Sequence, residues 1–155
     1  MSTDDWLARL EAEQTDLVLE HFDRRDAWLL GSAIAERALT ESLPIVVDVR
    51  TASGILFHAS MPGATSDNDE WVRRKSSLAF RFETSSALLE ARAAAGARDM
   101  FADGWLDPAE YALAGGAVPV RVRGVGVVAI ATVSGLPSAD DHAVVVQALR
   151  GLRQA

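Results

Sequence analysis

The second half of the chain contains two valine-rich stretches, residues 117–122 and 125–133, that are separated only by Arg123 and Gly124. β-Branched residues favour strands, and a short glycine-containing link between two such stretches is typical of a β-hairpin. Strands joined by a hairpin run antiparallel, and helices must cover the sheet that they build. This segment therefore predicts an α/β domain whose sheet is antiparallel or mixed.

Patterns elsewhere predict the remaining elements, in the order α, β, α, β, β, then two or three helices before the hairpin and one helix after it. Three further strands are expected over residues 17–22, 45–50 and 55–60. Helices are expected to begin at residues of capping type, namely Thr3, Asp23, Asp67, Thr84 or Ser85, Asp107 and Ser138. Asp107 gives the strongest signal, because proline follows at the first helical position and Glu110 at the third. Since no linker or solenoid-length repeat appears, residues 1–155 are expected to form a single domain.

Charge and cysteine content exclude several classes of protein. A formal net charge of −7 argues against a general nucleic-acid binder, which needs a basic face to displace phosphate counterions. The absence of cysteine excludes disulfides and thiolate metal sites. The acidic N-terminal residues do not resemble a signal peptide, and the longest apolar run, residues 125–133, has about half the length of a membrane helix. We therefore expect a cytoplasmic protein that does not bind membranes.

The run Gly124–Ala129 matches the glycine spacing of a dinucleotide-binding loop. That loop requires a turn from a strand into a helix, so that the pyrophosphate meets the helix N-terminus. Here the run lies inside a valine-rich strand. We interpret Gly124 as the hairpin turn and Gly126 as a bulge or a close backbone approach.

The chain has three histidines, and two of them are candidates for a functional role. His58 alternates with Leu56 and Ser60 on one face of an expected strand, where it is either a rim residue or a ligand. His142 lies in the first turn of the last helix, where a cation is disfavoured, so it has either a functional or interface role or a role beside the helix cap. A zinc site would require histidines from distant segments to converge with a carboxylate, and no local spacing supports one.

Two further segments are candidates for ligand or subunit contacts. Residues 71–75, Trp-Val-Arg-Arg-Lys, are a basic cluster in an acidic chain, and they suit a solvated face, an anion site or a subunit contact. They point in different directions over one helical turn, so they cannot all bind one anion. Gly115 and Gly116 lead to Pro119 through a helix-to-strand corner, which either caps the helix or lets a ligand approach the backbone.

These motifs together carry a resemblance to a known family. Residues 62–75, 115–119, 125–128 and 133–142 are similar to the haem-degrading-domain family related to HbpS and GlcG, and within it to a branch of uncharacterised proteins. The similarity covers the chain from about Leu17 to Leu152. It implies a profilin-like α/β fold with a five-stranded antiparallel sheet flanked by helices. It also implies homo-oligomers, haem binding with slow haem breakdown in some relatives, and a chaperone-pathway adaptor role in a eukaryotic one.

The resemblance also indicates which residues form a ligand or interface cluster, although it assigns no catalytic role to any of them. These residues are Trp71, Arg74, Gly115, Gly116, Pro119 and His142. Many members of the branch have a histidine before the double glycine and a phenylalanine before the proline, where this chain has Ala114 and Val118. We therefore expect no haem ligand at this corner and a smaller, more apolar pocket. Axial ligation of haem would fall to His58 or His142.

The sequence thus supports three hypotheses about function. The first is a haem-binding or small-ligand-binding oligomer, in which any degradation rests on the chemistry of the cofactor. The second is a non-enzymatic oligomeric adaptor, in which Arg73, Arg74 and the last helix contact subunits or partners. The third is an enzyme that acts on a small carboxylated metabolite held by the basic cluster.

Overall fold

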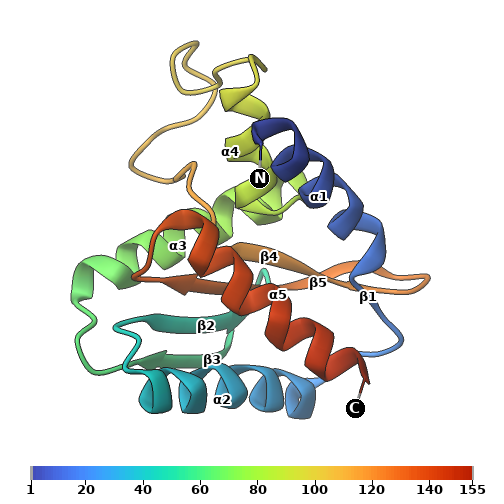
Figure 1. The fold of residues 1–155 in the computed structure, drawn as a ribbon, viewed down its shortest axis with the longest axis vertical. Coiled ribbons are helices and arrows are strands. Elements are labelled where there is room, and N and C mark those ends of the chain that lie inside the picture. The colour runs from blue at the N-terminus through green and yellow to red at the C-terminus, as the bar shows by residue number, and fades with distance from the viewer. Residues whose placement is uncertain (1, 155) are drawn as a thin grey trace.

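The computed structural model describes residues 2–154, and its centre is a five-stranded sheet with the strand order β1-β4-β5-β2-β3 (Figure 1). The strands are β1 (Val18–Leu19), β2 (Val46–Arg50), β3 (Ile55–Ser60), β4 (Ala117–Val122) and β5 (Gly126–Ser134). The β4–β5 hairpin is confirmed, and the expected strands β2 and β3 form a second hairpin, in which Thr51 N donates to Gly54 O over 2.8 Å. β2 pairs with β5 between these two hairpins, so four strands form one antiparallel unit.

The sheet is mixed, because β1 runs parallel to β4. The expectation of a purely antiparallel sheet is therefore wrong at this one edge, and the strand expected over residues 17–22 shrinks to two residues. No hairpin joins β1 to β4, so connection length does not force the two strands to run in opposite directions. β1 lies in the short connection between the first two helices, and it pairs with β4 at the edge of the sheet.

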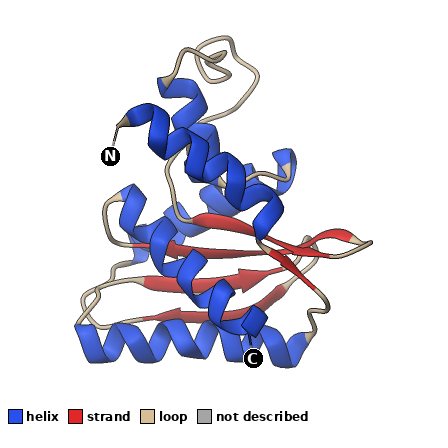
Figure 2. Ribbon diagram, turned by 45° about the vertical axis from the view of Figure 1, so that its right-hand side comes forward, coloured by secondary structure: helices blue, strands red, loops and turns tan. Residues whose placement is uncertain are grey.

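Helices lie on both faces of the sheet, as Figure 2 shows, and residues 2–154 contain five of them. They are α1 (Thr3–Asp16), α2 (Arg24–Glu41), α3 (Ser66–Phe82), α4 (Ser86–Ala94) and α5 (Ser138–Gln154). Apolar residues of α2 and α5, including Leu30 and Val145, pack with Val47, Val118 and Val133 in the main core. α3 covers the other face over β4 and β5, where Ala79 packs against Ala117 and Ile130. α1 and α4 pack on each other in a separate cluster around Leu10 and Leu88.

Helix starts were predicted well where side chains satisfy the first backbone N–H groups. Asp23 and Asp26 form the expected capping box of α2, and Ser85 caps α4. Two starts are shifted by one or two residues: Ser2 caps α1, and Thr65 with Asn68 begins α3. These shifts do not alter which side of either helix faces the core.

The strongest capping signal does not begin a helix. Asp107 O accepts from Glu110 N and Tyr111 N, which completes one turn, and its side chain accepts from Ala109 N. The chain then extends, because Ala112 N donates to Arg74 O on α3 rather than continuing the turn. A tertiary hydrogen bond therefore ends what the local sequence begins. No helix within residues 2–154 combines the length and the apolarity needed to cross a membrane.

Candidate functional site

A buried lysine joins three segments at the corner before β4. Lys75 Nζ, from α3, donates to Gly115 O over 2.9 Å, to Val133 O over 2.6 Å and to Asp141 Oδ2 over 3.2 Å. These three acceptors match the three protons of an ammonium group. Only 2% of the Lys75 side chain and 4% of the Asp141 side chain are exposed. We call these residues, Lys75, Gly115, Val133 and Asp141, the Lys75 cluster.

Burial opposes both charges of this pair. It lowers the pKa of Lys75 and raises the pKa of Asp141, while the attraction between the two groups acts in the other direction on each. Asp141 Oδ1 also accepts from Leu136 N over 2.9 Å, which fixes the loop between β5 and α5. The sequence predicted a capping box between Ser138 and Asp141. Asp141 does not close it, because its carboxylate oxygens accept from Leu136 N and from Lys75 Nζ instead.

The double glycine at this corner is required by close packing. A Cβ atom at Gly115 would lie 2.6 Å from Ser138 O, and one at Gly116 would lie 2.4 Å from Val133 O and 2.5 Å from Lys75 Nζ. Gly116 also has φ +130°, which side chains rarely adopt. The corner therefore brings its own backbone against Lys75 and α5, rather than leaving room for a ligand to approach.

A cleft of about 270 Å³ opens beside the Lys75 cluster. It brings together Trp71 and Gly115, two of the residues that the resemblance singled out. The cleft is small, but Asn68 and Ser138 also line it, so it is more polar than expected from Ala114 and Val118. The physical reason is that Val118 packs into the main core and does not face this cleft.

The two arginines of the basic cluster make separate contacts. Arg74 stacks over the Trp71 ring, with 4.5 Å from its guanidinium carbon to the ring centroid, and donates to Pro108 O over 3.4 Å. Arg73 forms ion pairs with Glu70 and Glu110 at the surface. Together with the buried Lys75, these contacts leave no group of cations converging on one anion.

His58 lies in a chain of charged side chains on the side of β2 and β3 that faces α3. Its Nδ1 lies 2.7 Å from Asp48 Oδ2, and its Nε2 lies 2.7 Å from Asp69 Oδ1 on α3. Arg50 holds the other side of Asp48 with two hydrogen bonds of 2.6 Å and 2.8 Å. We call Arg50, Asp48, His58 and Asp69 the His58 network. Both ring nitrogens face carboxylates, so the network favours the doubly protonated imidazolium form of His58.

The pKa of His58 reflects two opposing effects. Burial would lower the pKa, but the hydrogen bonds to Asp48 and Asp69 outweigh it and raise the pKa above the ordinary value. The sequence placed His58 on the correct strand face, but it gave no sign of Asp48 or Asp69 as partners. Register decided the first contact, because Asp48 lies directly opposite His58 in the β2–β3 pair.

His142 and Pro119 lie away from the corner cleft. Pro119 is buried in β4 opposite Ile130. His142 is 2% exposed on the side of α5 that faces α1, where its Nε2 lies 2.7 Å from Glu13 Oε1. The expected cluster is thus divided among the cleft, the strand and the α1–α5 contact.

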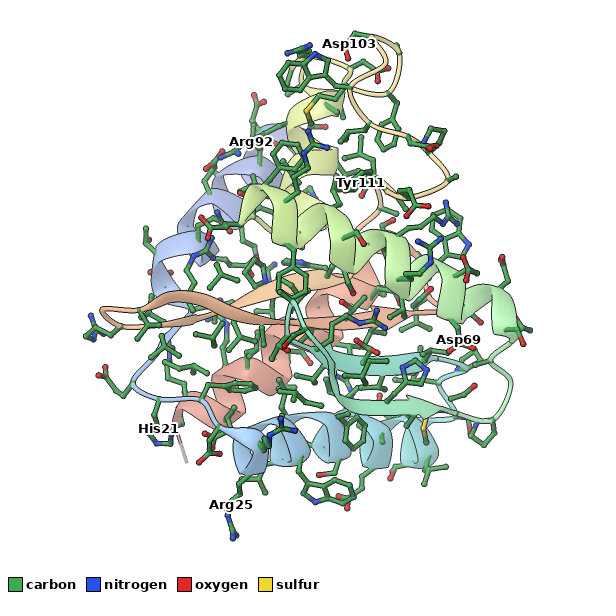
Figure 3. The ribbon with its side chains drawn as sticks, turned by 180° about the vertical axis from the view of Figure 1, so that it is seen from behind. His21, Arg25, Asp69, Arg92, Asp103 and Tyr111 are labelled. Carbon is green, nitrogen blue, oxygen red and sulfur yellow. The ribbon has the colours of Figure 1, made fainter. Side chains whose placement is uncertain are left out.

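His21 is the histidine that the sequence did not mark as functional. It follows β1 and lies at the far end of the molecule from Asp69 (Figure 3). Its side chain is 80% exposed, and its Nδ1 lies 3.0 Å from Asp26 Oδ2. It lines a cavity of about 580 Å³ together with Arg123 and Arg153, and we call this space the His21 cavity. The available signal was the five-residue spacing from His21 to the capping-box residue Asp26.

The fold and these sites define a small α/β domain in which carboxylates pair with all three histidines. The family model for the haem degrading protein HbpS-like family matches residues 22–150, and the chain belongs to this family. It is also 43% identical over 143 residues to a UPF0303 protein of Streptomyces avermitilis, which covers 92% of this chain and 88% of that protein.

Solved structures share the fold. The crystal structure of the Ybr137w protein is 30% identical and superposes with a TM-score of 0.85, covering 96% of this chain and 88% of that one. A PduOC–haem complex is 22% identical with a TM-score of 0.72, covering 83% of this chain and 93% of that chain. At this lower identity the PduOC comparison shows the common fold alone.

The first prediction concerns the Lys75 cluster. Lys75→Met preserves the side-chain volume but leaves the buried Asp141 carboxylate without its cation, so it should lower the free energy of unfolding by about 3–5 kcal/mol. Arg73→Met is the matched control, because exposed ion pairs contribute at most about 1 kcal/mol after solvent screening. Urea unfolding of both variants measures the difference. Equal costs would contradict the role of Lys75 at the corner.

The second prediction concerns the pH dependence of the His58 network. A raised folded-state pKa stabilises the fold below the unfolded pKa of about 6.5, and this contribution disappears as the pH rises through the folded pKa. His58→Gln should therefore destabilise the protein more at a pH of about 5.5 than at a pH of about 9. Urea midpoints of both proteins at the two pH values test this. A loss of stability that is independent of pH would mean that protonation of His58 does not contribute to the free energy of unfolding.

Proposed function

We propose that this chain binds haem in the His21 cavity. The observation that carries the proposal is the state of the His21 ring. Nδ1 faces Asp26, and among residues 2–154 no side chain or backbone group is hydrogen-bonded to Nε2. Haem iron is commonly held by one histidine nitrogen, so a mostly exposed ring with one available nitrogen meets the first requirement.

The contact with Asp26 supports this assignment. A histidine that binds a metal usually donates its other N–H to a carboxylate, which fixes the tautomer and makes the ligating nitrogen more basic. Asp26 is itself held in place, because the same Oδ2 accepts from Asp23 N over 2.9 Å in the capping box. The cap of α2 thus orients the ring of His21.

The walls of the cavity suit a flat apolar group with acidic side chains. Leu19, Leu29 and Leu152 provide apolar surface, while Arg123 and Arg153 provide cations for the two propionates. Arg123 is paired with Glu20, but both side chains are about two-thirds exposed, so exchanging that partner costs little. A volume of about 580 Å³ also lies within the usual range for small-molecule sites.

Bound haem would supply iron-centred redox and oxygen chemistry, and the chain would supply binding and orientation. The two histidines predicted from the sequence are less accessible for this purpose. Both nitrogens of His58 face carboxylates, and His142 is buried against Glu13. Their assignment as axial ligands stays a prediction that the following experiment also tests.

Titration of the protein with haemin should give a saturable Soret shift at one haem per chain. His21→Ala should abolish this shift, because it removes the only histidine nitrogen available in the cavity. Asp26→Asn should weaken affinity by about 10–100-fold through loss of the carboxylate partner. Absorbance titrations give both quantities.

Arg25→Ala is the control, since Arg25 is an exposed residue of α2, the helix that contains Asp26, and does not line the cavity. His58→Ala and His142→Ala should leave the shift intact. Loss of the shift in either of these variants, with His21→Ala unaffected, would move the ligand to the sequence-predicted residue. Unsaturable binding in every variant would refute haem binding altogether.

A second candidate function, a self-associating adaptor, is supported by an apolar stripe on α2. Trp28 is 62% exposed and Leu39 is 60% exposed, and eleven residues correspond to about three helical turns, so both lie on one side of α2. Trp28 also contacts Phe57 of the edge strand β3, with 5.5 Å between ring centroids. Exposed apolar surface of this kind marks interaction sites, and a second copy of the chain would bury it symmetrically.

Sedimentation velocity tests the α2 stripe. Trp28→Glu should convert the wild-type oligomer into a smaller species, because a carboxylate at the centre of an apolar contact would be buried without a partner. Trp105→Glu is the control, since that tryptophan is 58% exposed but lies outside every helix and strand. A monomeric wild-type chain, or an unchanged oligomer in Trp28→Glu, would refute this interface. An effect of Arg74→Glu instead would favour the basic cluster of α3.

A further inference from the structure

A second cavity, of about 540 Å³, lies where α1 meets α5. Its lining includes Trp6, Arg9 and Glu13 from α1, and His142 and Arg150 from α5. It shares no lining residue with the His21 cavity. We call it the His142 cavity.

His142 has an unfilled hydrogen-bonding position in this cavity wall. Its Nε2 lies 2.7 Å from the buried Glu13 carboxylate, and the edge of its ring meets Trp6, with 5.8 Å between centroids. Its Nδ1 is buried and has no hydrogen-bond partner within residues 2–154. Buried polar atoms are nearly always paired, so an isolated one indicates a missing partner.

The cavity also contains two arginines that are only weakly paired with its acidic side chains. Within residues 2–154, Arg9 forms no ion pair, and its guanidinium carbon lies 5.9 Å from the Trp6 ring centroid. Arg150 reaches Glu13 only at 3.7 Å and is 42% exposed. Asp140 is the remaining charged group of the lining. The two arginines and the two carboxylates of the lining balance, but among the residues that the structure describes only Arg150 is paired with one of these carboxylates, so Arg9 is available to an anion.

The volume indicates what kind of partner is missing. One water would satisfy Nδ1, but a water occupies about 30 Å³. The His142 cavity is many times larger, and it falls within the range of about 300–1,000 Å³ typical of small-molecule sites. Its apolar part comes from Trp6, Ala143 and Val146. The space therefore suits a molecule with a carbon skeleton and one charged end.

We propose that the His142 cavity binds a small carboxylate with an apolar or aromatic body. Arg9 and Arg150 pair with the carboxylate, and a protonated His142 donates from Nδ1 to it while Nε2 donates to Glu13. In the complex both ring N–H groups have acceptors, and the proton that His142 gains offsets the charge of the bound carboxylate. The apolar body packs beside Trp6. This site is independent of the proposed haem site, so either can fail without the other.

Benzoate serves as the probe and benzyl alcohol as its neutral counterpart of similar shape. Titration of the full chain with benzoate, followed through the imidazole ¹⁵N resonances of His142, should move Nδ1 saturably from the unprotonated to the protonated form. Arg9→Gln and Arg150→Gln should each weaken benzoate binding by about tenfold or more, the effect of losing one charge-assisted hydrogen bond.

Both arginines have exposed or partly exposed side chains, so these variants are expected to fold. Arg92→Gln is the control, because Arg92 is a partly exposed arginine that pairs with Glu11 and does not line the cavity. Equal binding of benzyl alcohol would overturn the assignment of an anion. A His142 Nδ1 resonance that does not respond to benzoate would overturn the site itself and leave an enclosed water as the partner.

Discussion

The ammonium group of Lys75 holds together the part of the molecule where four segments meet. It ties α3 to the corner before β4, to the end of β5 and, through Asp141, to the start of α5. Because every proton of the ammonium has an acceptor, the charge can be buried without a large unpaired cost. Gly115 and Gly116 follow from the same requirement, since a side chain at either position would collide with this arrangement. Because the segments at this corner pack closely together, the cleft beside them is small.

The three histidines show how environment separates similar side chains. Each lies within hydrogen-bonding distance of a carboxylate, yet one is exposed, one bridges two acids and one is buried with an unpaired nitrogen. Both ring nitrogens of the bridging His58 have carboxylate partners, and His58 links β3 to Asp48 on β2 and to Asp69 on α3. His21 and His142 each line a cavity with two arginines. Ligand binding is therefore better supported in these two cavities than at the glycine corner.

Local sequence was a good guide wherever local physics decides the outcome. The valine-rich hairpin, the strands over residues 45–50 and 55–60 and the capping box of α2 were predicted with nearly the correct bounds, because strand alternation and capping act over a few residues. The turn at Asp107 failed for a tertiary reason, since Ala112 N bonds to α3. The candidate site was predicted only in part: Trp71 and Gly115 do share a cleft, whereas Pro119, His58 and His142 lie elsewhere.

The sequence by itself determined the α/β class, the glycine-cornered hairpin that leads into the last helix, and the resemblance to haem-degrading proteins. Only the tertiary structure decided which charges meet. Asp48 reaches His58 through strand register, Glu13 reaches His142 across 129 residues, and Lys75 reaches Asp141 across 66. Such pairs depend on how helices pack on the sheet, and neither periodicity nor capping encodes that geometry. The mixed sheet has the same origin, because the direction of β1 is set by the path of the chain between helices rather than by its own residues.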